Sequence, residues 1–252
     1  MITQWPLVIF TVLAQLGAGT ALFSTLRTHW GAGPSPRGWT FAAIVSTLAF
    51  LAGVSACKGV GSGAMAAAQG ACLLLAAFSA CALRRMPFCA LAACVAGGAC
   101  VLCQAAASVP GALLSPSGIF PFLLFFLSAG VLGASFVQLP WMDEPDDKAI
   151  RYGRLYLPLR FCLWTMLIIT AVAPCVPWGD PLMNKSAFYW MQTQLYWLGV
   201  IFSGVAIGLS HMGRITLLLQ AAVTFISVFG LRTAFFADSV HGAIDLGTLY
   251  LR

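Results

Sequence analysis

Eight apolar stretches of about twenty residues each run through the sequence and constrain its fold more than any other feature. They cover residues 5–26, 39–57, 64–83, 87–107, 118–139, 156–175, 190–210 and 215–236. A helix of this length spans a hydrocarbon core of about 30 Å and satisfies its own backbone hydrogen bonds there, which an open sheet cannot do. The sequence therefore predicts an all-α polytopic membrane protein with eight transmembrane helices.

The charged residues lie mostly between these stretches. Only 8% of the residues are charged and 60% are hydrophobic, a composition that excludes an ordinary soluble domain. The net charge of +6 comes without a basic stripe interleaved with aromatic residues, so we expect no nucleic-acid partner. Eight lysines and arginines follow the odd-numbered stretches, against three on the other side. Because basic loops stay cytoplasmic, both termini are predicted on the outer, periplasmic face.

The longest polar connection, residues 140–154, is interpreted as a solvated cytoplasmic loop. We predict one integral membrane domain, residues 1–252, which this loop divides into halves 1–139 and 140–252 arranged as two four-helix bundles. The nine cysteines lie in apolar stretches, and a single CxxC, Cys100 to Cys103, has no second pair. A structural zinc site needs four converging ligands, so we expect no metal site.

Arg232 is unusual because it lies inside the last apolar stretch. An arginine at the bilayer centre costs roughly 2.5–3.5 kcal/mol on insertion scales. At helical spacing it shares a face with Phe225, Phe229 and Phe236. Its position, about four residues or ~6 Å below the outer end of the stretch, permits two interpretations. The side chain could extend to the membrane surface, or it could belong to a functional site.

Five other polar residues are predicted in or near the outer half of the membrane. Lys58 follows the second stretch, Gln69 lies about a turn inside the third, and Gln15 lies nearer the middle of the first. Asp238 and His241 follow the last stretch. Each has a structural interpretation as well: Lys58 as a membrane anchor, the glutamines as interhelical hydrogen-bonding groups, and His241 as a solvated residue.

The remaining polar residues argue against two kinds of chemistry. The three histidines, His29, His211 and His241, cannot form a bis-histidine pair at matching depth, so we expect no haem. The apolar stretches contain no carboxylate, the usual proton relay of coupled transporters. A small transporter stays open as one alternative function.

Two segments resemble a known family. QWPLVIFTVLAQLGAG (Gln4–Gly19) resembles the first helix of the membrane-anchor subunit of dimethyl sulfoxide reductase-type molybdoenzyme complexes, and FGLRTAFF (Phe229–Phe236) resembles that family's last helix. The resemblance implies an anchor in the bacterial cytoplasmic (inner) membrane that serves anaerobic respiration. It implies that the anchor oxidises menaquinol near the outer face and passes electrons to an iron–sulfur subunit, which lies there with a molybdopterin catalytic subunit. Arg232 and Gln15 occupy family positions.

The sequence departs from the family pattern at two places. Cys57 or Lys58 replaces a histidine after the second helix, and Gln69 replaces a glutamate at the start of the third. These departures favour a second alternative, a structural anchor without a working quinol site. The predicted quinol site has apolar walls, donors to the ring oxygens and proton acceptors, drawn from Phe229, Phe236, Arg232, Lys58, Gln15, Gln69, His241 and Asp238.

Overall fold

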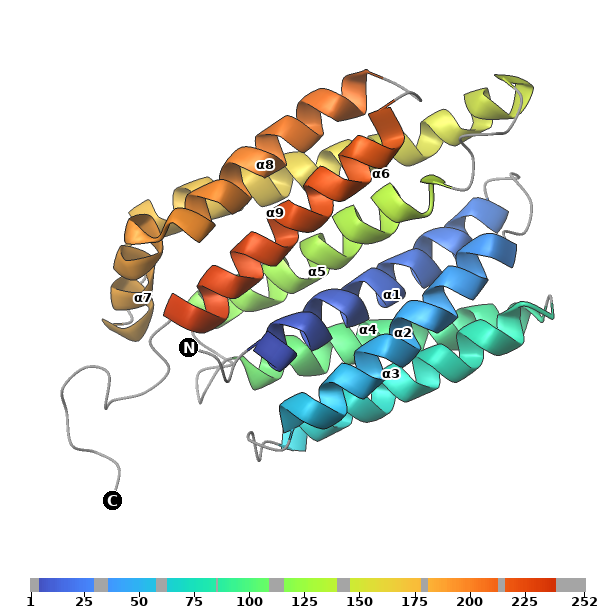
Figure 1. Cartoon of the computed structure of the whole chain (residues 1–252), viewed down its shortest axis with the longest axis horizontal. Helices are drawn as coiled ribbons and strands as arrows, with labels where there is room; N and C mark the ends of the chain where they lie inside the picture. The colour runs from blue at the N-terminus through green and yellow to red at the C-terminus, as the bar shows by residue number, and fades with distance from the viewer. Residues whose placement is uncertain are drawn as a thin grey trace.

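A computed structural model describes residues 5–29, 36–57, 63–84, 86–108, 116–139, 146–177, 181–212 and 216–238. Nearly all of these residues are helical, and none of them lies in a strand. The elements (Figure 1) are α1 (Trp5–His29), α2 (Pro36–Cys57), α3 (Gly63–Ala82), α4 (Pro87–Ala107), α5 (Pro116–Phe136), α6 (Asp146–Val172), the short 3₁₀ helix η3 (Ala173–Cys175), α7 (Pro181–Gln192), α8 (Gln194–His211) and α9 (Leu217–Asp238).

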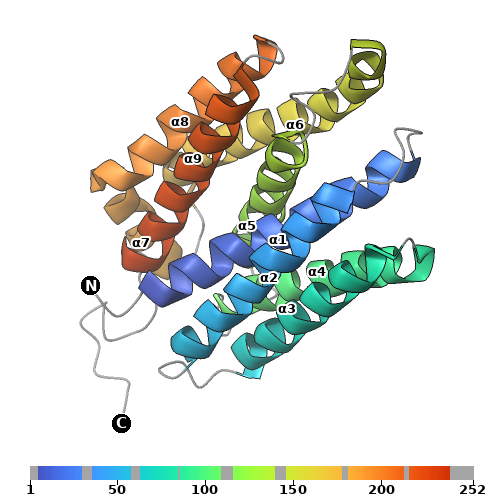
Figure 2. The same cartoon turned by 45° about the vertical axis from the view of Figure 1, so that its right-hand side comes forward.

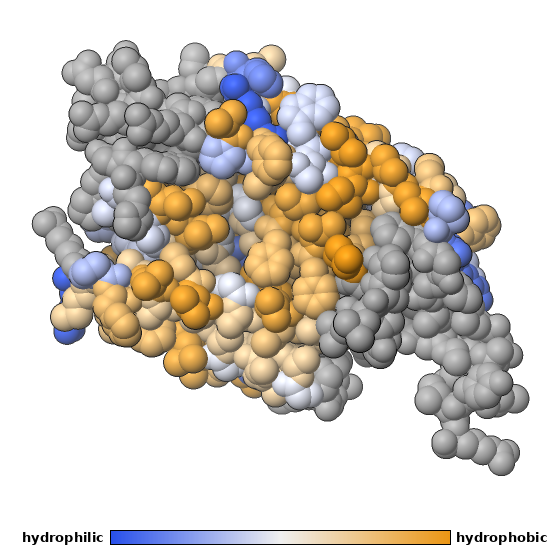
Figure 3. Space-filling view, turned by 180° about the vertical axis from the view of Figure 1, so that it is seen from behind, coloured by the Kyte–Doolittle hydropathy of each residue, from blue (hydrophilic) through white to orange (hydrophobic). Residues whose placement is uncertain are grey.

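Eight helices in this part of the chain are long and apolar enough to cross a membrane: α1 to α6, α8 and α9. This confirms the prediction of an all-α polytopic membrane protein. The space-filling view of one face shows mostly apolar side chains over its described surface (Figure 3), as expected for a surface in contact with lipid.

Two boundaries differ from the prediction. The predicted stretch 190–210 is broken at Thr193, whose backbone is extended (φ −90°, ψ 124°), so that the 12-residue helix α7 precedes α8. Helix α7 was missed because it is too short and too polar for a spanning stretch, although Pro181 at its first position favours a helix start. The predicted polar loop 140–154 was also wrong in part, because α6 begins at Asp146.

Helix α1 occupies the centre of the molecule. It contacts α2, α4, α5 and α9 (Figures 1 and 2), and most of its residues are buried. Helix α5 contacts α1 and α4 on one side and α6 and α9 on the other. The predicted halves 1–139 and 140–252 therefore share an interface along α5, and their arrangement as two four-helix bundles stays a prediction.

The backbones of α1 and α5 touch at a pair of glycines. A Cβ atom on Gly19 would overlap the carbonyl oxygen of Ala129, and a Cβ atom on Gly133 would overlap the backbone of Gly19. Small residues allow this approach in membrane proteins, where close packing drives helix association. The two helices are thus fixed together near the middle of the bundle.

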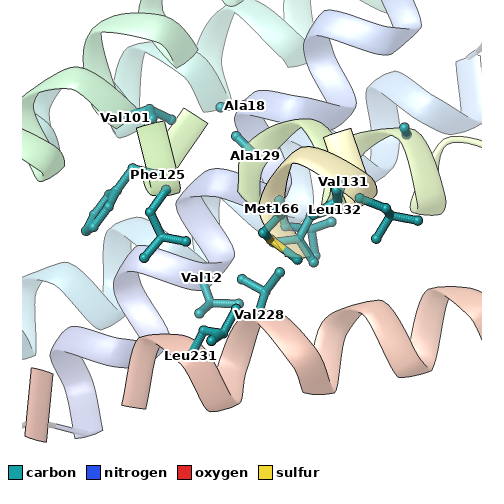
Figure 4. Close-up of a cluster of buried hydrophobic side chains, with 14 of the residues drawn as sticks. Val12, Ala18, Val101, Phe125, Ala129, Val131, Leu132, Met166, Val228 and Leu231 are labelled. Atoms are coloured by element: carbon teal, nitrogen blue, oxygen red, sulfur yellow. The ribbon is translucent and has the colours of Figure 1, made fainter. Parts of the chain in front are cut away.

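Apolar side chains from the central helices fill the space around this crossing. Figure 4 shows Val12 of α1, Leu132 of α5, Met166 of α6 and Val228 of α9 in one buried cluster. At one end of the bundle, Trp5 at the start of α1 stacks on Phe229 of α9, with ring centroids 5.8 Å apart. The start of the first span and the later turns of the last span therefore lie at the same end, and the membrane face to which this end belongs stays a prediction.

Candidate functional site

The side chain of Arg232 points into the bundle and joins three helices. It is 0% exposed. Its Nε and Nη2 atoms donate to Oε1 of Gln15 on α1, at 3.4 and 3.3 Å. Nη2 also lies 3.0 Å from the Ser128 hydroxyl and 3.0 Å from the Leu124 carbonyl oxygen, both on α5. The interpretation that Arg232 extends to the membrane surface is therefore wrong, because acceptors on α1 and α5 hold its guanidinium in the interior.

A phenylalanine ring covers one face of this guanidinium. The guanidinium carbon lies 3.6 Å from the ring centroid of Phe125 on α5, close enough for a cation–π interaction. Phe125 in turn meets the rings of Phe235 and Phe236 edge to face, at 6.0 and 6.4 Å. Phe236 thus contacts the ring that covers the guanidinium, and its role in the wall of a quinol site stays a prediction.

The polar side-chain atoms of Arg232 and Gln15 that make no hydrogen bond to a described residue are all donors. Nη1 of Arg232 and Nε2 of Gln15 are buried and have no hydrogen-bond partner among the residues that the structure describes. The guanidinium fixes the orientation of the Gln15 amide, because only its oxygen can accept from an arginine. Among the residues that the structure describes, no carboxylate pairs with Arg232. The site therefore carries a positive charge and spare N–H groups, which complement oxygen acceptors.

The site lies deeper in the membrane-spanning region than we predicted from the position of Arg232 along the chain. Gln15 lies ten residues after Trp5, or about 15 Å along the axis of α1. Ser128 lies twelve residues after Pro116, or about 18 Å along α5. The guanidinium is thus nearer the middle of the spans than the predicted ~6 Å from one end.

Two predicted site residues have contacts with groups other than the guanidinium. Phe229 stacks on Trp5 and on Phe225, at 5.8 and 6.1 Å, so the ring that faces Arg232 is Phe125 instead. Gln69 is on α3, and its Cγ is close to Gly53 of α2. Its predicted place in a quinol site with Arg232 stays a prediction.

Three other predicted residues are not tested by the structure. Lys58 and His241 lie outside the described residues. Asp238 is the last residue of α9, and only its backbone is described.

Helix α5 supplies the contacts that the sequence did not predict. Ser128 carried a weak signal, because it is the one polar side chain in the segment FPFLLFFLSAGVLG. Nothing in the sequence indicated Phe125 or the Leu124 carbonyl, because the sequence does not say which turn of α5 faces α9.

A group of contacting aromatic rings extends from this site to α7. Trp190 of α7 is buried, and its ring lies 5.5 Å from Phe120, 5.8 Å from Phe235 and 5.9 Å from Tyr196. Phe235 also contacts Phe125, the ring over the guanidinium. The side chains next to the Arg232 site on this side are therefore flat and apolar.

Over the described residues, no group of three or more His, Cys, Asp and Glu side chains is placed to hold a metal ion. Comparison with known proteins gives no matching family model, no similar curated protein and no similar solved structure. The function is therefore argued from the geometry of the Arg232 site.

Proposed function

We propose that this chain is the membrane-anchor subunit of a respiratory oxidoreductase complex and that it binds a quinol at Arg232. The observation that supports this proposal is the pair of contacting side chains, Arg232 and Gln15, with spare donors in an interior of apolar rings. A quinone or quinol is a flat apolar ring whose oxygens accept hydrogen bonds. Such a ring would pack beside Phe125 and accept from Nη1 of Arg232 and Nε2 of Gln15.

The charge of the site suits quinol oxidation. A quinol loses two electrons and two protons to become a quinone, and its oxygens become more negative as the protons leave. A guanidinium close to one oxygen stabilises that negative charge. Arginine keeps its own proton, so another group must accept those of the quinol. In this proposal Asp238 or His241 accepts them, and the electrons pass to an iron–sulfur subunit and then to a molybdopterin catalytic subunit at the outer face.

A ring cannot reach these donors without some movement of the protein. Arg232 and Gln15 are both 0% exposed, so a neighbouring side chain has to move before a ligand binds. The same observation favours a second function, a purely structural anchor. In that function the hydrogen bonds from Arg232 to α1 and α5 only hold the helices together.

A binding assay with an isolated quinone ring distinguishes the quinol-binding anchor from the purely structural anchor. The full chain in phospholipid nanodiscs is titrated with a tail-less dimethylnaphthoquinone, a menaquinone ring without its isoprenoid chain. Arg232→Met removes the donors and leaves an apolar chain of similar length. Arg160→Met is the matched control, because Arg160 is an arginine on α6 whose Nη2 donates to the Ser210 carbonyl of α8 at 2.6 Å, outside the candidate site.

We expect the unmodified chain to bind the ring and Arg232→Met to bind it at least about tenfold more weakly, because a hydrogen bond to a charged group contributes about 1.5–3 kcal/mol. Arg160→Met should bind within about twofold of the unmodified chain, a difference under ~0.5 kcal/mol. A folded chain that binds no ring would refute the quinol site and favour the structural anchor. Equal binding by Arg232→Met and the unmodified chain would show that a ring binds elsewhere.

A further inference from the structure

An apolar groove lies between α5 and α6. Its volume is about 260 Å³, and all of its lining residues are apolar: Ile119, Phe120, Leu123, Ile168, Ile169, Val172, Ala173 and Val176. Ile119, Ile168 and Val172 at its rim are 56%, 56% and 48% exposed. Since α5 and α6 are both spanning helices, this rim faces the lipid. The groove therefore suits a hydrocarbon chain and offers no side-chain partner to a polar headgroup.

Neighbouring residues of α5 connect the groove to the Arg232 site. Phe120 and Leu123 line the groove, whereas the next residues contact the guanidinium, Leu124 through its carbonyl oxygen and Phe125 through its ring. The groove and the guanidinium thus contact the same short segment of α5. A second connection runs through the rings, because Phe120 stacks on Trp190.

A proline weakens the helix at this turn. Pro121 lies inside α5 and has no N–H, so the carbonyl four residues earlier loses its α-helical partner. Prolines inside helices are a known cause of bends. The missing bond is at the carbonyl of Ser117, so the first turns of α5, next to the groove, are the part of this helix that can tilt with the smallest loss of backbone hydrogen bonds.

We infer that the groove binds the isoprenoid tail of the quinol whose ring binds at Arg232, and that the ring reaches the site from the lipid past the Ile119–Phe125 turn of α5. This inference rests on the proposed function and adds to it the binding site of the tail and the route of access. The tail is apolar and branched, as are the isoleucine, leucine and valine side chains along the groove. The ring is the only polar part of the ligand, and it would lie on the side of α5 that faces the donors of Arg232 and Gln15.

Two probes test the inference: a menaquinone with its isoprenoid tail, and the tail-less dimethylnaphthoquinone. Val172→Trp fills the groove from its lipid-exposed rim, where a larger side chain needs no space in the core. Leu74→Trp on α3 is the matched control, because Leu74 is similarly exposed and lies outside the groove. Binding is measured on the full chain in nanodiscs, whose phospholipid acyl chains compete with the tail throughout.

We expect Val172→Trp to weaken binding of the tailed menaquinone about tenfold, because the tail loses buried apolar contact, and to leave ring binding unchanged. Leu74→Trp should change neither. If Val172→Trp binds the tailed probe normally, or weakens both probes equally, the inference is overturned while the quinol site stands. If the unmodified chain binds neither probe, the proposed function fails, which is a distinct result.

Discussion

The contact between Arg232 and Gln15 can be tested by a double-mutant cycle. Gln15→Leu removes Oε1, the acceptor for Nε and Nη2 of the guanidinium. Neutral interhelical hydrogen bonds in membrane proteins average ~0.6 kcal/mol and reach ~1.7 kcal/mol, and charge-assisted ones are roughly twice as strong. Treating the two long contacts as one shared bond, we expect Gln15→Leu to lower the free energy of unfolding by about 1–3 kcal/mol.

The second arm of the cycle is Arg232→Met. It removes the buried charge and leaves both polar atoms of the Gln15 amide buried without a partner, at a cost of about 1–3 kcal/mol. The double variant has neither the uncompensated charge nor the orphaned amide. Its destabilisation should therefore be smaller than the sum of the two single effects, by about 1–3 kcal/mol.

The free energies are measured by unfolding the purified chain in mixed micelles with increasing fractions of a denaturing detergent. The control cycle pairs Arg232→Met with Gln69→Leu. Because Gln69 lies beside Gly53 of α2 and is not among the hydrogen-bond partners of Arg232, these two effects should add within ~0.5 kcal/mol. Additive effects for Gln15 and Arg232 as well would refute the reasoning, since a guanidinium held by Gln15 cannot be independent of it.

Two further predictions concern the packing and the orientation of the helices. Gly19→Ala should destabilise the chain by about 1–3 kcal/mol in the same unfolding assay, because the added Cβ overlaps the Ala129 carbonyl. Gly98→Ala should be neutral or slightly stabilising, because its added Cβ meets nothing within 4 Å. Equal changes in unfolding free energy for Gly19→Ala and Gly98→Ala would contradict the close contact of α1 and α5. The orientation can be tested in variants that keep a single cysteine, either Cys175 or Cys81, since both thiols are exposed. A membrane-impermeant maleimide on intact cells should label Cys175, which lies at the predicted outer ends of the spans. It should label Cys81 only after permeabilisation. The opposite pattern would place both termini inside.

The spanning helices could be predicted from the sequence because lipid leaves few alternatives. A long apolar segment must satisfy its backbone internally, so its length and composition nearly determine its structure. Helix α7 lacked this constraint. Its structure depends on local signals such as Pro181 and on the contacts of Trp190 with α5, α8 and α9, which hydropathy does not describe.

The candidate site was predictable only in part. Arg232 and Gln15 were identified because polar side chains are rare inside apolar stretches and therefore visible. Phe125 was not identified, because a phenylalanine among many phenylalanines carries no signal until the facing helix is known. Gln69 was grouped with Arg232 by its predicted depth and by the family resemblance, and neither says which face of a helix bundle a side chain enters.

The glycine contact explains why the acceptors of Arg232 meet at one place. Gln15 lies four residues before Gly19 on α1 and therefore on the same face, and Ser128 precedes Ala129, the residue that Gly19 touches on α5. The close approach at Gly19 thus brings an amide and a hydroxyl from two helices within reach of one guanidinium from a third. A Gly19→Ala chain that still folds should therefore also bind the tail-less quinone ring more weakly than Gly98→Ala does. If its ring affinity is unchanged while its stability falls, the helix crossing stabilises the bundle without positioning the site.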